Sequence, residues 1–297
     1  MIPDALRGPG LTVLENAPLA QRTTLKIGGP ALYLVEAADA DALARTLRFA
    51  AEARLPVLTL GKGSNLLVPD AGFRGVVLVL AGDFRAIRID GTEVVAGGGV
   101  PLMALAVAAR DAGLSGVENI SGIPSSIGGA VRINAGSYGS EIFDVLDSAT
   151  LVSSEGTVRS AAASKIPHGY RWTALCDTGE IVAEARLHLA PKSREEISAR
   201  MSEVAAKRRD ALPKQPNAGS IFKNPKGTFA GRLLEECGLK GRSVGGAEVS
   251  TVHANVIVNT GGATAEDVRR LMEEMKRAVR EKFGIELQPE IQVVGGS

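Results

Sequence analysis

The chain has 297 residues, and at about 150 residues per domain this length predicts two domains or one large one. Hydrophobic residues make up 45% and charged residues 23%, which excludes a disordered, collagenous or coiled-coil protein. The net charge of +1 argues against a dedicated binder of nucleic acid or membrane surfaces. The start lacks a charged head followed by an apolar run, and no stretch approaches about 18 apolar residues, so we expect a cytoplasmic protein.

Cysteine and histidine offer little chemistry in this sequence. Cys176 and Cys237 are too few for a disulfide scaffold and lack metal-ligand spacing, so we expect no metal site and two small buried side chains. The three histidines show no pair or triad spacing, which gives no support to histidine-based acid–base catalysis.

Strands and helices alternate through the first hundred residues. Apolar spacing predicts strands at 31–37, 56–60, 76–80, 86–89 and 93–96, and a helix at 39–54. Pro101 opens a second helix that stops at Gly113. The glycine-rich stretch 115–139 shows little periodicity and is followed by strands at 144–151 and 180–190.

A second module begins near Pro191. Ser193 and Glu196 form a capping box for a helix with an apolar stripe at Ile197, Met201 and Val204. A polar loop (213–227), a helix (230–237), a strand (254–259) and a long helix (264–283) ended by a glycine follow. Mixed strands and helices in two modules predict an α+β fold.

Several familiar motifs are absent from the sequence. It contains no G-x-G-x-x-G, no G-x-x-x-x-G-K-[ST], no G-x-S-x-G and no H-E-x-x-H. A Rossmann dehydrogenase and a P-loop nucleotidase are therefore disfavoured.

Two glycine segments are candidate ligand sites. Residues 61–65 (GKGSN) follow a buried strand and can form an anion-binding nest suited to a diphosphate, or else a tight turn that needs glycine at positive φ. Residues 121–130 (SGIPSSIGGA) suit backbone wrapped along a flat ligand with polar edges.

Three further polar residues are ambiguous when each is taken alone. Arg171 can be an ion-paired surface arginine, Ser220 a turn or cap residue, and Glu290 a solvated charge near a strand start.

Taken together, these segments resemble the UDP-N-acetylenolpyruvoylglucosamine reductase family, whose members are UDP-N-acetylmuramate dehydrogenases. The matching stretches occur in the family's order from about position 23 to position 290. They are Thr23 to Ala31, Leu60 to Val68, Gly116 to Gly139, Tyr170-Arg171, Ala218 to Pro225, Gly245 to Asn259 and Gln288-Pro289-Glu290.

The resemblance implies a fold and a cofactor. It implies an FAD-binding domain of the PCMH type, similar to vanillyl-alcohol oxidase, over 1–190, with subdomains at about 1–68 and 69–190, and a substrate-binding α+β domain over 191–297. The FAD is expected to be noncovalent, because Ser64-Asn65 stands in the loop where many related oxidases carry a histidine. The implied FAD-binding residues are Gly61, Lys62, Gly63, Ser64, Asn65, Ser121, Gly122, Ile123, Pro124, Ser125, Gly128, Gly129 and Ala130.

The resemblance also implies an activity. Family members use NADPH to reduce UDP-N-acetylglucosamine enolpyruvate to UDP-N-acetylmuramate for peptidoglycan, and we expect a monomer that binds neither nucleic acid nor membrane. Arg171 and Glu290 match the residues that stabilise charge on the substrate carboxylate, and Ser220 matches the proton donor. Tyr170, Lys214 and Asn224 match substrate contacts.

Some positions depart from the family pattern. Thr173 replaces a serine, Ser125-Ser126 replaces a Gly-Thr pair, and the interval from Lys214 to Ser220 is short. The compact chain resembles the family's short form, which lacks an extra loop over the substrate. Two alternatives stay open: an FAD oxidase of a sugar or hydroxy acid with the same fold, and a nucleotide-sugar-binding module without flavin.

Overall fold

The protein divides into two compact units made of interleaved chain segments. A computed structural model describes residues 2–295. The first unit comprises Met1–Asn16, Leu32–Lys62 and Arg74–Lys207, and the second comprises Ala17–Ala31, Gly63–Phe73 and Arg208–Ser297. The chain therefore crosses between the units several times, and the functional division predicted near positions 68 and 190 stays a prediction.

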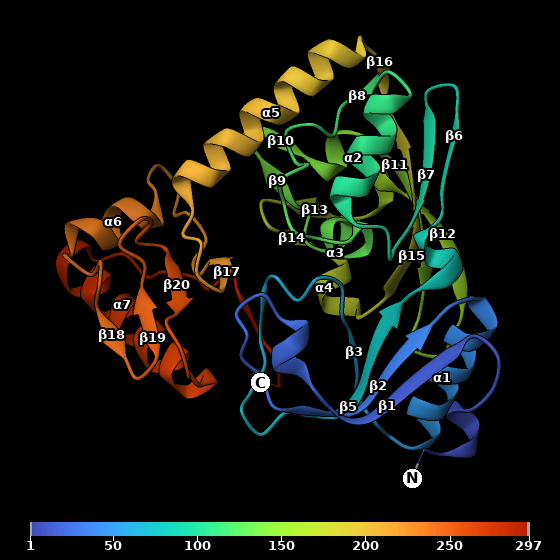
Figure 1. Cartoon of the computed structure of the whole chain (residues 1–297), viewed down its shortest axis with the longest axis horizontal. Coiled ribbons are helices and arrows are strands. Elements are labelled where there is room, and N and C mark those ends of the chain that lie inside the picture. The colour runs from blue at the N-terminus through green and yellow to red at the C-terminus, as the bar shows by residue number, and fades with distance from the viewer. Residues whose placement is uncertain (1, 296–297) are drawn as a thin grey trace. The chain divides into compact units, whose positions relative to one another are not determined.

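Helices occur in both units (Figure 1). They are α1 Ala40–Glu52, α2 Leu102–Asp111, α3 Ile127–Arg132, α4 Leu175–Thr178, α5 Arg194–Ala211, α6 Ala230–Glu236 and α7 Ala265–Phe283. The predicted helices at 39–54, 101–113, 230–237 and 264–283 are confirmed within a few residues at each end.

The first unit contains most of a four-stranded sheet and a five-stranded sheet. The four-stranded sheet has the order β1 (Leu11–Pro18), β2 (Pro30–Ala37), β5 (Phe73–Leu80), β3 (Val57–Thr59). The antiparallel five-stranded sheet has the order β12 (Val158–Ala162), β11 (Leu146–Val152), β15 (Ile181–His188), β7 (Glu93–Gly97), β6 (Ile87–Asp90). Short strands pair as β8 (Leu114–Ser115) with β16 (Ala190–Pro191), β9 (Gly136–Ser137) with β10 (Ser140–Glu141), and β13 (His168–Gly169) with β14 (Trp172–Thr173).

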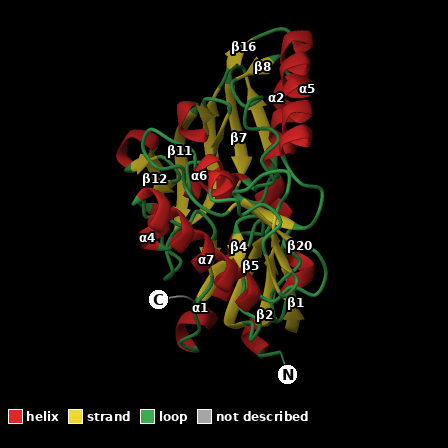
Figure 2. Ribbon diagram, turned by 90° about the vertical axis from the view of Figure 1, so that its left-hand side faces the viewer, coloured by secondary structure: helices red, strands yellow, loops and turns green. Residues whose placement is uncertain are grey.

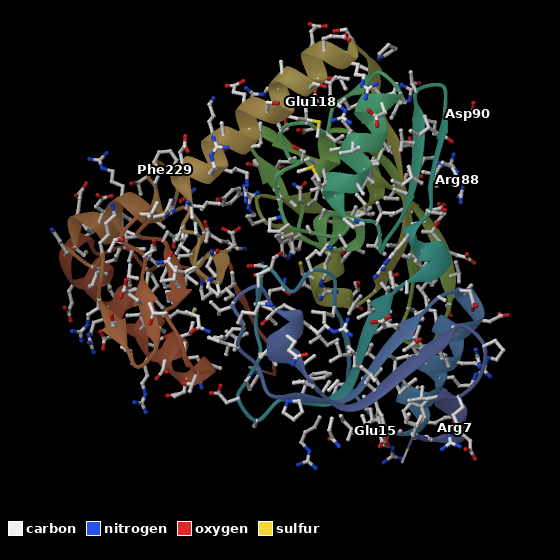
Figure 3. All side chains as sticks on the ribbon, in the orientation of Figure 1. Arg7, Glu15, Arg88, Asp90, Glu118 and Phe229 are labelled. Atoms are coloured by element: carbon white, nitrogen blue, oxygen red, sulfur yellow. The ribbon has the colours of Figure 1, made fainter. Side chains whose placement is uncertain are left out.

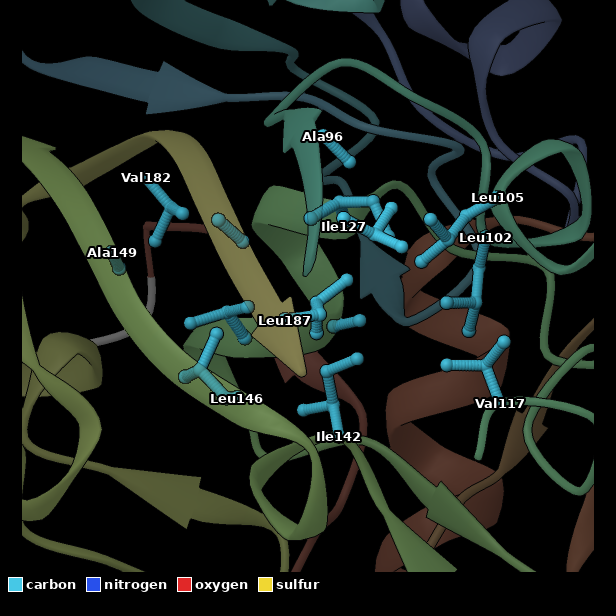
Figure 4. Close-up of a cluster of buried hydrophobic side chains, with 14 of the residues drawn as sticks. Ala96, Leu102, Leu105, Val117, Ile127, Ile142, Leu146, Ala149, Val182 and Leu187 are labelled. Atoms are coloured by element: carbon cyan, nitrogen blue, oxygen red, sulfur yellow. The ribbon is translucent and has the colours of Figure 1, made fainter. Parts of the chain in front are cut away.

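The main core of the first unit forms where α2 and α3 pack on the five-stranded sheet. Leu102 and Leu105 of α2, Ile127 of α3 and Leu187 of β15 are completely buried in this cluster (Figure 4). Burying each such side chain contributes about 1.5–3 kcal/mol of hydrophobic stabilisation. This core anchors α3, whose first four residues belong to the second glycine segment.

Helix α3 was not expected, because its sequence contains Gly128-Gly129 and glycine disfavours helix. Tertiary packing overrides that preference. A Cβ at Gly128 would lie 3.0 Å from the carbonyl oxygen of Gly98 and 3.1 Å from that of Val182. The glycine allows α3 to approach the sheet closely, and the Ser126 side chain caps the helix by accepting a hydrogen bond from the N–H of Gly129.

Strand β1 was also not expected. Leu11 and Val13 are half-buried, but the alternation of apolar and polar residues breaks at Leu14, which is 47% exposed while Glu15 is half-buried. Glu15 is labelled in Figure 3. Apolar alternation therefore gives only a partial signal for which face is covered.

The second unit contains an antiparallel sheet on which α7 packs. Helix α7 is labelled in Figure 2. The sheet has the order β17 (Asn217–Ser220), β20 (Val256–Asn259), β19 (Ala247–Val249), β18 (Ser243–Val244), and β4 (Leu66–Leu67) pairs in parallel with β21 (Gln292–Val293). Thr264 and Asp267 form a capping box at the start of α7, and the predicted apolar stripe is buried.

Two further observations concern the described residues. No helix within residues 2–295 is both long enough and apolar enough to cross a bilayer. Cys176 and Cys237 are free thiols but only half-buried, so the expectation that both are buried is wrong. Cys176 lies in the short helix α4, and Cys237 caps the end of α6 at the edge of a hydrophobic core.

Glu118 is a buried carboxylate close to the second glycine segment (Figure 3). It accepts hydrogen bonds from the Ser115 hydroxyl at 2.5 Å and from the N–H of Gly116 at 2.6 Å. Burial alone would raise the pKa of Glu118, but these hydrogen bonds and the charge of Lys192 hold that pKa below its ordinary value. Its stabilising contribution is therefore present above the pKa of the unfolded chain and is lost as pH falls through the folded-state pKa.

We predict that Glu118→Gln lowers the free energy of unfolding at neutral pH by about 1–3 kcal/mol, because a charged acceptor of two hydrogen bonds is lost. The difference from wild type should shrink as pH falls through the acidic range. Urea denaturation of both proteins across that range measures it. A difference that does not change with pH would contradict the role of the carboxylate charge.

Candidate functional site

The first glycine segment, residues 61–65, leaves the first unit at Lys62 and enters the second at Gly63. Gly61 and Lys62 are exposed, whereas Gly63 is buried with φ +61°. A Cβ at Gly63 would lie 2.3 Å from the carbonyl oxygen of Arg22 and 2.9 Å from the Cα of Thr23. Glycine is therefore required at position 63 by backbone conformation and by space.

Ser126 of the second glycine segment lies beside Gly61 of the first, and both residues belong to the first unit. A Cβ at Gly61 would lie 2.5 Å from the Oγ of Ser126, so no side chain fits between them. Two segments about sixty positions apart thus pack directly on each other at Gly61 and Ser126.

Within the second segment, the structure assigns different surroundings to the predicted FAD residues. Pro124 is exposed, and Gly122, Ile123 and Ser125 are half-buried. Ser121 and Ala130 are buried, and the Ser121 hydroxyl donates to the carbonyl of Glu118 at 2.8 Å. The N–H groups of Gly128 and Gly129 already donate within the unit, to the Gly98 carbonyl and to the Ser126 hydroxyl.

Arg171 lies at the tip of a hairpin in the first unit. Tyr170 and Arg171 form the two-residue connection between β13 and β14, and Arg171 has φ +55°. Its Nη2 donates to the Gly136 carbonyl at 2.6 Å, and its guanidinium lies 5.1 Å from the ring centroid of Tyr170. A left-handed conformation at a non-glycine residue is strained, and such strain is typical of functional sites.

A buried asparagine that sequence reasoning missed supports this hairpin. Asn134 is completely buried, and its Nδ2 donates to the Gly169 carbonyl at 3.2 Å and to Glu141 at 2.6 Å. Thr173, the departure from the family serine, is buried and donates its hydroxyl to the Arg132 carbonyl at 2.6 Å. The threonine therefore performs a structural task that a hydroxyl residue is needed for.

Ser220 and Glu290 are brought onto neighbouring backbone in the second unit. Ser220 ends β17, which contains a register shift and a left-handed Gly219 at φ +72°. The Glu290 N–H donates to the Ile221 carbonyl at 2.8 Å, so Glu290 sits beside the residue that follows Ser220. Seventy positions of sequence separate residues that the fold holds next to each other.

Asn65 joins the first glycine segment to Glu290 within the second unit. Its Nδ2 donates to the Glu290 carbonyl at 3.0 Å, and its own carbonyl accepts from the Gln292 N–H at 3.0 Å. Thr24, which sequence reasoning did not single out, donates its hydroxyl to the Asn217 carbonyl at 2.6 Å and its N–H to the Gly63 carbonyl at 3.1 Å. The first glycine segment is thus hydrogen-bonded to Glu290 directly and, through Thr24, to β17, the strand that contains Ser220.

Lys214 and Asn224 lie on exposed parts of the second unit. The Asn224 side-chain oxygen accepts a hydrogen bond from the Ala230 N–H at 3.1 Å at the start of α6, so this residue also has a structural role. Among residues 2–295, no group of three or more histidine, cysteine or acidic residues is arranged to hold a metal ion.

Comparisons with known proteins all indicate the same family. The FAD binding domain profile matches residues 31–162, and the profile described as UDP-N-acetylenolpyruvoylglucosamine reductase, C-terminal domain, matches residues 211–294. The UDP-N-acetylenolpyruvoylglucosamine reductase 2 of Symbiobacterium thermophilum is 45% identical over 98% of this chain and 94% of its own length. The Bacillus velezensis reductase is 42% identical over 96% of this chain and 95% of its own.

Solved structures agree with that result. The crystal structure of UDP-N-acetylenolpyruvylglucosamine reductase from Thermus caldophilus matches with a TM-score of 0.82 and 39% identity, covering 95% of this chain and 98% of that one. The 6-hydroxy-D-nicotine oxidase of Arthrobacter nicotinovorans matches with a TM-score of 0.50 and 19% identity, covering 97% of this chain and 64% of that one, which indicates a shared fold only.

We predict that Gly63→Ala lowers both stability and FAD retention, because its Cβ meets backbone atoms that cannot move aside. Gly91→Ala is the matched control, since Gly91 has φ +56° but nothing within 4 Å of its would-be Cβ. The control should show only the left-handed backbone penalty of about 1–2 kcal/mol. Urea midpoints and FAD content after desalting measure both effects, and equal losses in the two variants would contradict the crowding argument.

Proposed function

This chain belongs to the UDP-N-acetylenolpyruvoylglucosamine reductase family, and from that membership we propose that it reduces UDP-N-acetylglucosamine enolpyruvate to UDP-N-acetylmuramate with NADPH. The observation that carries the proposal is the hydrogen bond from the Glu290 N–H to the carbonyl of Ile221, the residue that follows Ser220. The Asn65 side chain also links Glu290 to the first glycine segment. Ser220 and Glu290 are the proton donor and the acidic residue that the family resemblance assigns. The product serves peptidoglycan synthesis.

The cofactor is FAD, and it supplies hydride transfer from NADPH to the substrate when it is bound. The residues proposed to hold it are the exposed backbone of Gly61 and Lys62, the adjoining Gly63-Ser64-Asn65, and the segment 121–130. The exposed main chain of Gly61 and Lys62 supports this assignment, because the diphosphate of a cofactor needs close approach of main-chain N–H groups. Neither segment contains a histidine, in keeping with noncovalent binding.

Arg171 is proposed to bind the carboxylate of the enolpyruvyl group. Hydride addition at the methylene carbon builds negative charge on the adjacent carbon and its carboxylate, and a fixed guanidinium stabilises that charge. The hydrogen bond to Gly136 and the Tyr170 ring orient the arginine before substrate arrives. Little reorganisation is then needed during the reaction.

Ser220 is proposed to complete the reduction by donating its hydroxyl proton to the carbon next to the carboxylate. One hydride and one proton are added in all, which converts the enol ether into a lactyl ether. Proton donation by a side chain depends first on where its donor atom lies relative to the acceptor atom. The irregular strand β17 fixes the backbone of Ser220 and so helps to set that position. Glu290 in its protonated form can donate a hydrogen bond to the same carboxylate.

Further assignments follow from the family resemblance. Tyr170 is a proposed substrate contact, and Lys214 and Asn224 are proposed contacts for the uridine-diphosphate part of the substrate. We also propose a monomer, and a cytoplasmic location because both NADPH and a nucleotide-linked sugar are soluble metabolites and the composition favours no membrane or nucleic-acid partner. The functional division into an FAD domain at 1–190 and a substrate domain at 191–297 is likewise a proposal.

Anaerobic stopped-flow spectroscopy tests the proposed function. NADPH should bleach the flavin absorbance of the purified protein, and UDP-N-acetylglucosamine enolpyruvate should then restore it. A protein that stays colourless when FAD is supplied would contradict the flavin assignment. Bleaching without recovery, or rapid recovery with oxygen in the presence of substrate, would favour an oxidase of the same fold.

We predict that Ser220→Ala slows flavin reoxidation by the enolpyruvyl substrate about 100- to 10,000-fold, because the proton donor is lost. Flavin reduction by NADPH should be unchanged. Ser243→Ala, an exposed serine of the same unit, is the control. Equal slowing of both half-reactions would remove Ser220 from the proton-donor role.

We predict that Arg171→Ala slows the same reoxidation step about 100- to 1,000-fold, as expected when one electrostatic contact to a developing charge is lost. Arg171→Lys keeps the charge but not the bond geometry and should lie between Ala and wild type. Single-turnover traces with each variant measure this order. An unimpaired reoxidation rate in Arg171→Ala would contradict the assignment.

A further inference from the structure

Asn255 is a buried side chain for which the proposed chemistry has no direct use. It is 2% exposed and immediately precedes β20 in the second unit. An amide buried to this extent must have its hydrogen bonds satisfied, because an unpaired polar group costs about 1–3 kcal/mol. The hydrogen-bond partners of Asn255 therefore indicate its role.

Both polar ends of the Asn255 carboxamide bind the main chain of one residue. Its Oδ1 accepts from the Phe222 N–H at 3.0 Å, and its Nδ2 donates to the Phe222 carbonyl at 2.8 Å. The Asn255 main-chain carbonyl accepts from the Ile221 N–H at 2.9 Å. One residue therefore holds three backbone groups of the two consecutive residues Ile221 and Phe222, as an adjacent strand would.

These bonds lie at the point where the sheet stops supporting the Ser220 strand. The regular pairing of β17 with β20 ends at Ser220 opposite Val256. Beyond it, the Ile221 carbonyl is the group that accepts the Glu290 N–H. Asn255 thus fixes the two residues that connect Ser220 to the backbone of Glu290.

Asn255 is itself held in place. Its N–H donates to the Nδ1 of His253 at 3.2 Å, and the His253 N–H donates to the Ser250 hydroxyl at 3.3 Å. Burial lowers the pKa of His253, which keeps the imidazole neutral and Nδ1 free to accept. A Cβ at Gly231 would lie 3.0 Å from the imidazole Cε1, so α6 closes over the ring.

We propose that Asn255 is a positioning residue for proton transfer, because its carboxamide fixes the spacing between Ser220 and Glu290 through the main chain of Ile221 and Phe222. This role rests on the proposed function. A displacement of about 1 Å at a reacting group can slow a reaction about 100-fold, so a clamp two residues from the proton donor has a large effect on its step. Asn255 touches neither proton nor substrate.

The test compares Asn255→Ala and Asn255→Asp with Asn259→Ala. Asn259 lies at the other end of β20, and its carboxamide donates to the Leu25 carbonyl at 3.1 Å and accepts from Gly261 and Ala263 N–H groups. It therefore matches Asn255 in residue type and lies in the strand that Asn255 precedes, but it does not contact Phe222. Stopped-flow spectroscopy gives both half-reaction rates per bound FAD, in H₂O and in D₂O, and thermal melting gives stability.

The Asn255 variants should slow reoxidation by the enolpyruvyl substrate up to about 100-fold and leave reduction by NADPH unchanged. The slowed step should show a larger solvent isotope effect, because proton donation becomes limiting. In Asn255→Asp the rate should recover as pH falls, since the new carboxyl group can then donate to the Phe222 carbonyl. Asn259→Ala should lower the melting temperature without changing the ratio of the two rates.

Other outcomes separate the two proposals. A wild-type enzyme that the enolpyruvyl substrate does not reoxidise contradicts the proposed function. A wild-type enzyme that it does reoxidise, with Asn255 variants behaving like Asn259→Ala, overturns only the positioning role. If the variants do not fold, amide hydrogen exchange in the wild-type protein decides: the Phe222 and Glu290 amides should exchange with equal protection, and independent exchange would overturn the clamp.

Discussion

Hydrogen bonds hold both the N–H and the carbonyl of Glu290, and the arrangement of the second unit follows from that constraint. Its N–H is bound by the Ile221 carbonyl and its carbonyl by the Asn65 side chain. Neither bond belongs to a long strand, so short contacts replace an extended sheet. This gives a fixed acidic residue close to the end of the described chain, where backbone usually frays.

The proposed function gives the first glycine segment two tasks that conflict in an ordinary loop. Its first half is proposed to stay open for main-chain contact with the cofactor, and its second half must be rigid because the Asn65 side chain binds the Glu290 carbonyl. Gly63 separates the two halves, because its left-handed conformation and its close packing on Arg22 and Thr23 fix the backbone directly after the exposed residues. The next residues form β4, whose pairing with β21 keeps the following chain rigid as well. The proposed cofactor loop and the support of the acidic residue are thus one continuous piece of chain.

Local patterns predicted the parts of the fold whose sequence and environment agree. Helices α1 and α7 have apolar stripes and side-chain caps, and both were found as expected. Helix α3 was missed because close packing against Gly98 and Val182, which no local pattern records, outweighs the low helix propensity of Gly128-Gly129. Strand β1 was missed because Leu14 faces outward. The interleaving of the two units is likewise invisible to periodicity.

The sequence predicts only part of the candidate site, because the residues that hold the site in place leave no local pattern. Ser220 and Glu290 carry no local signal, and the resemblance alone singled them out. The residues that fix them, Asn255 and Thr24, act through main-chain carbonyls and N–H groups, which are the same at every position whatever the sequence. A sequence can therefore indicate which side chains perform chemistry when a family is recognised. It cannot indicate which amides and hydroxyls hold them, because that depends on which backbone groups the sheet leaves unpaired at its irregular end.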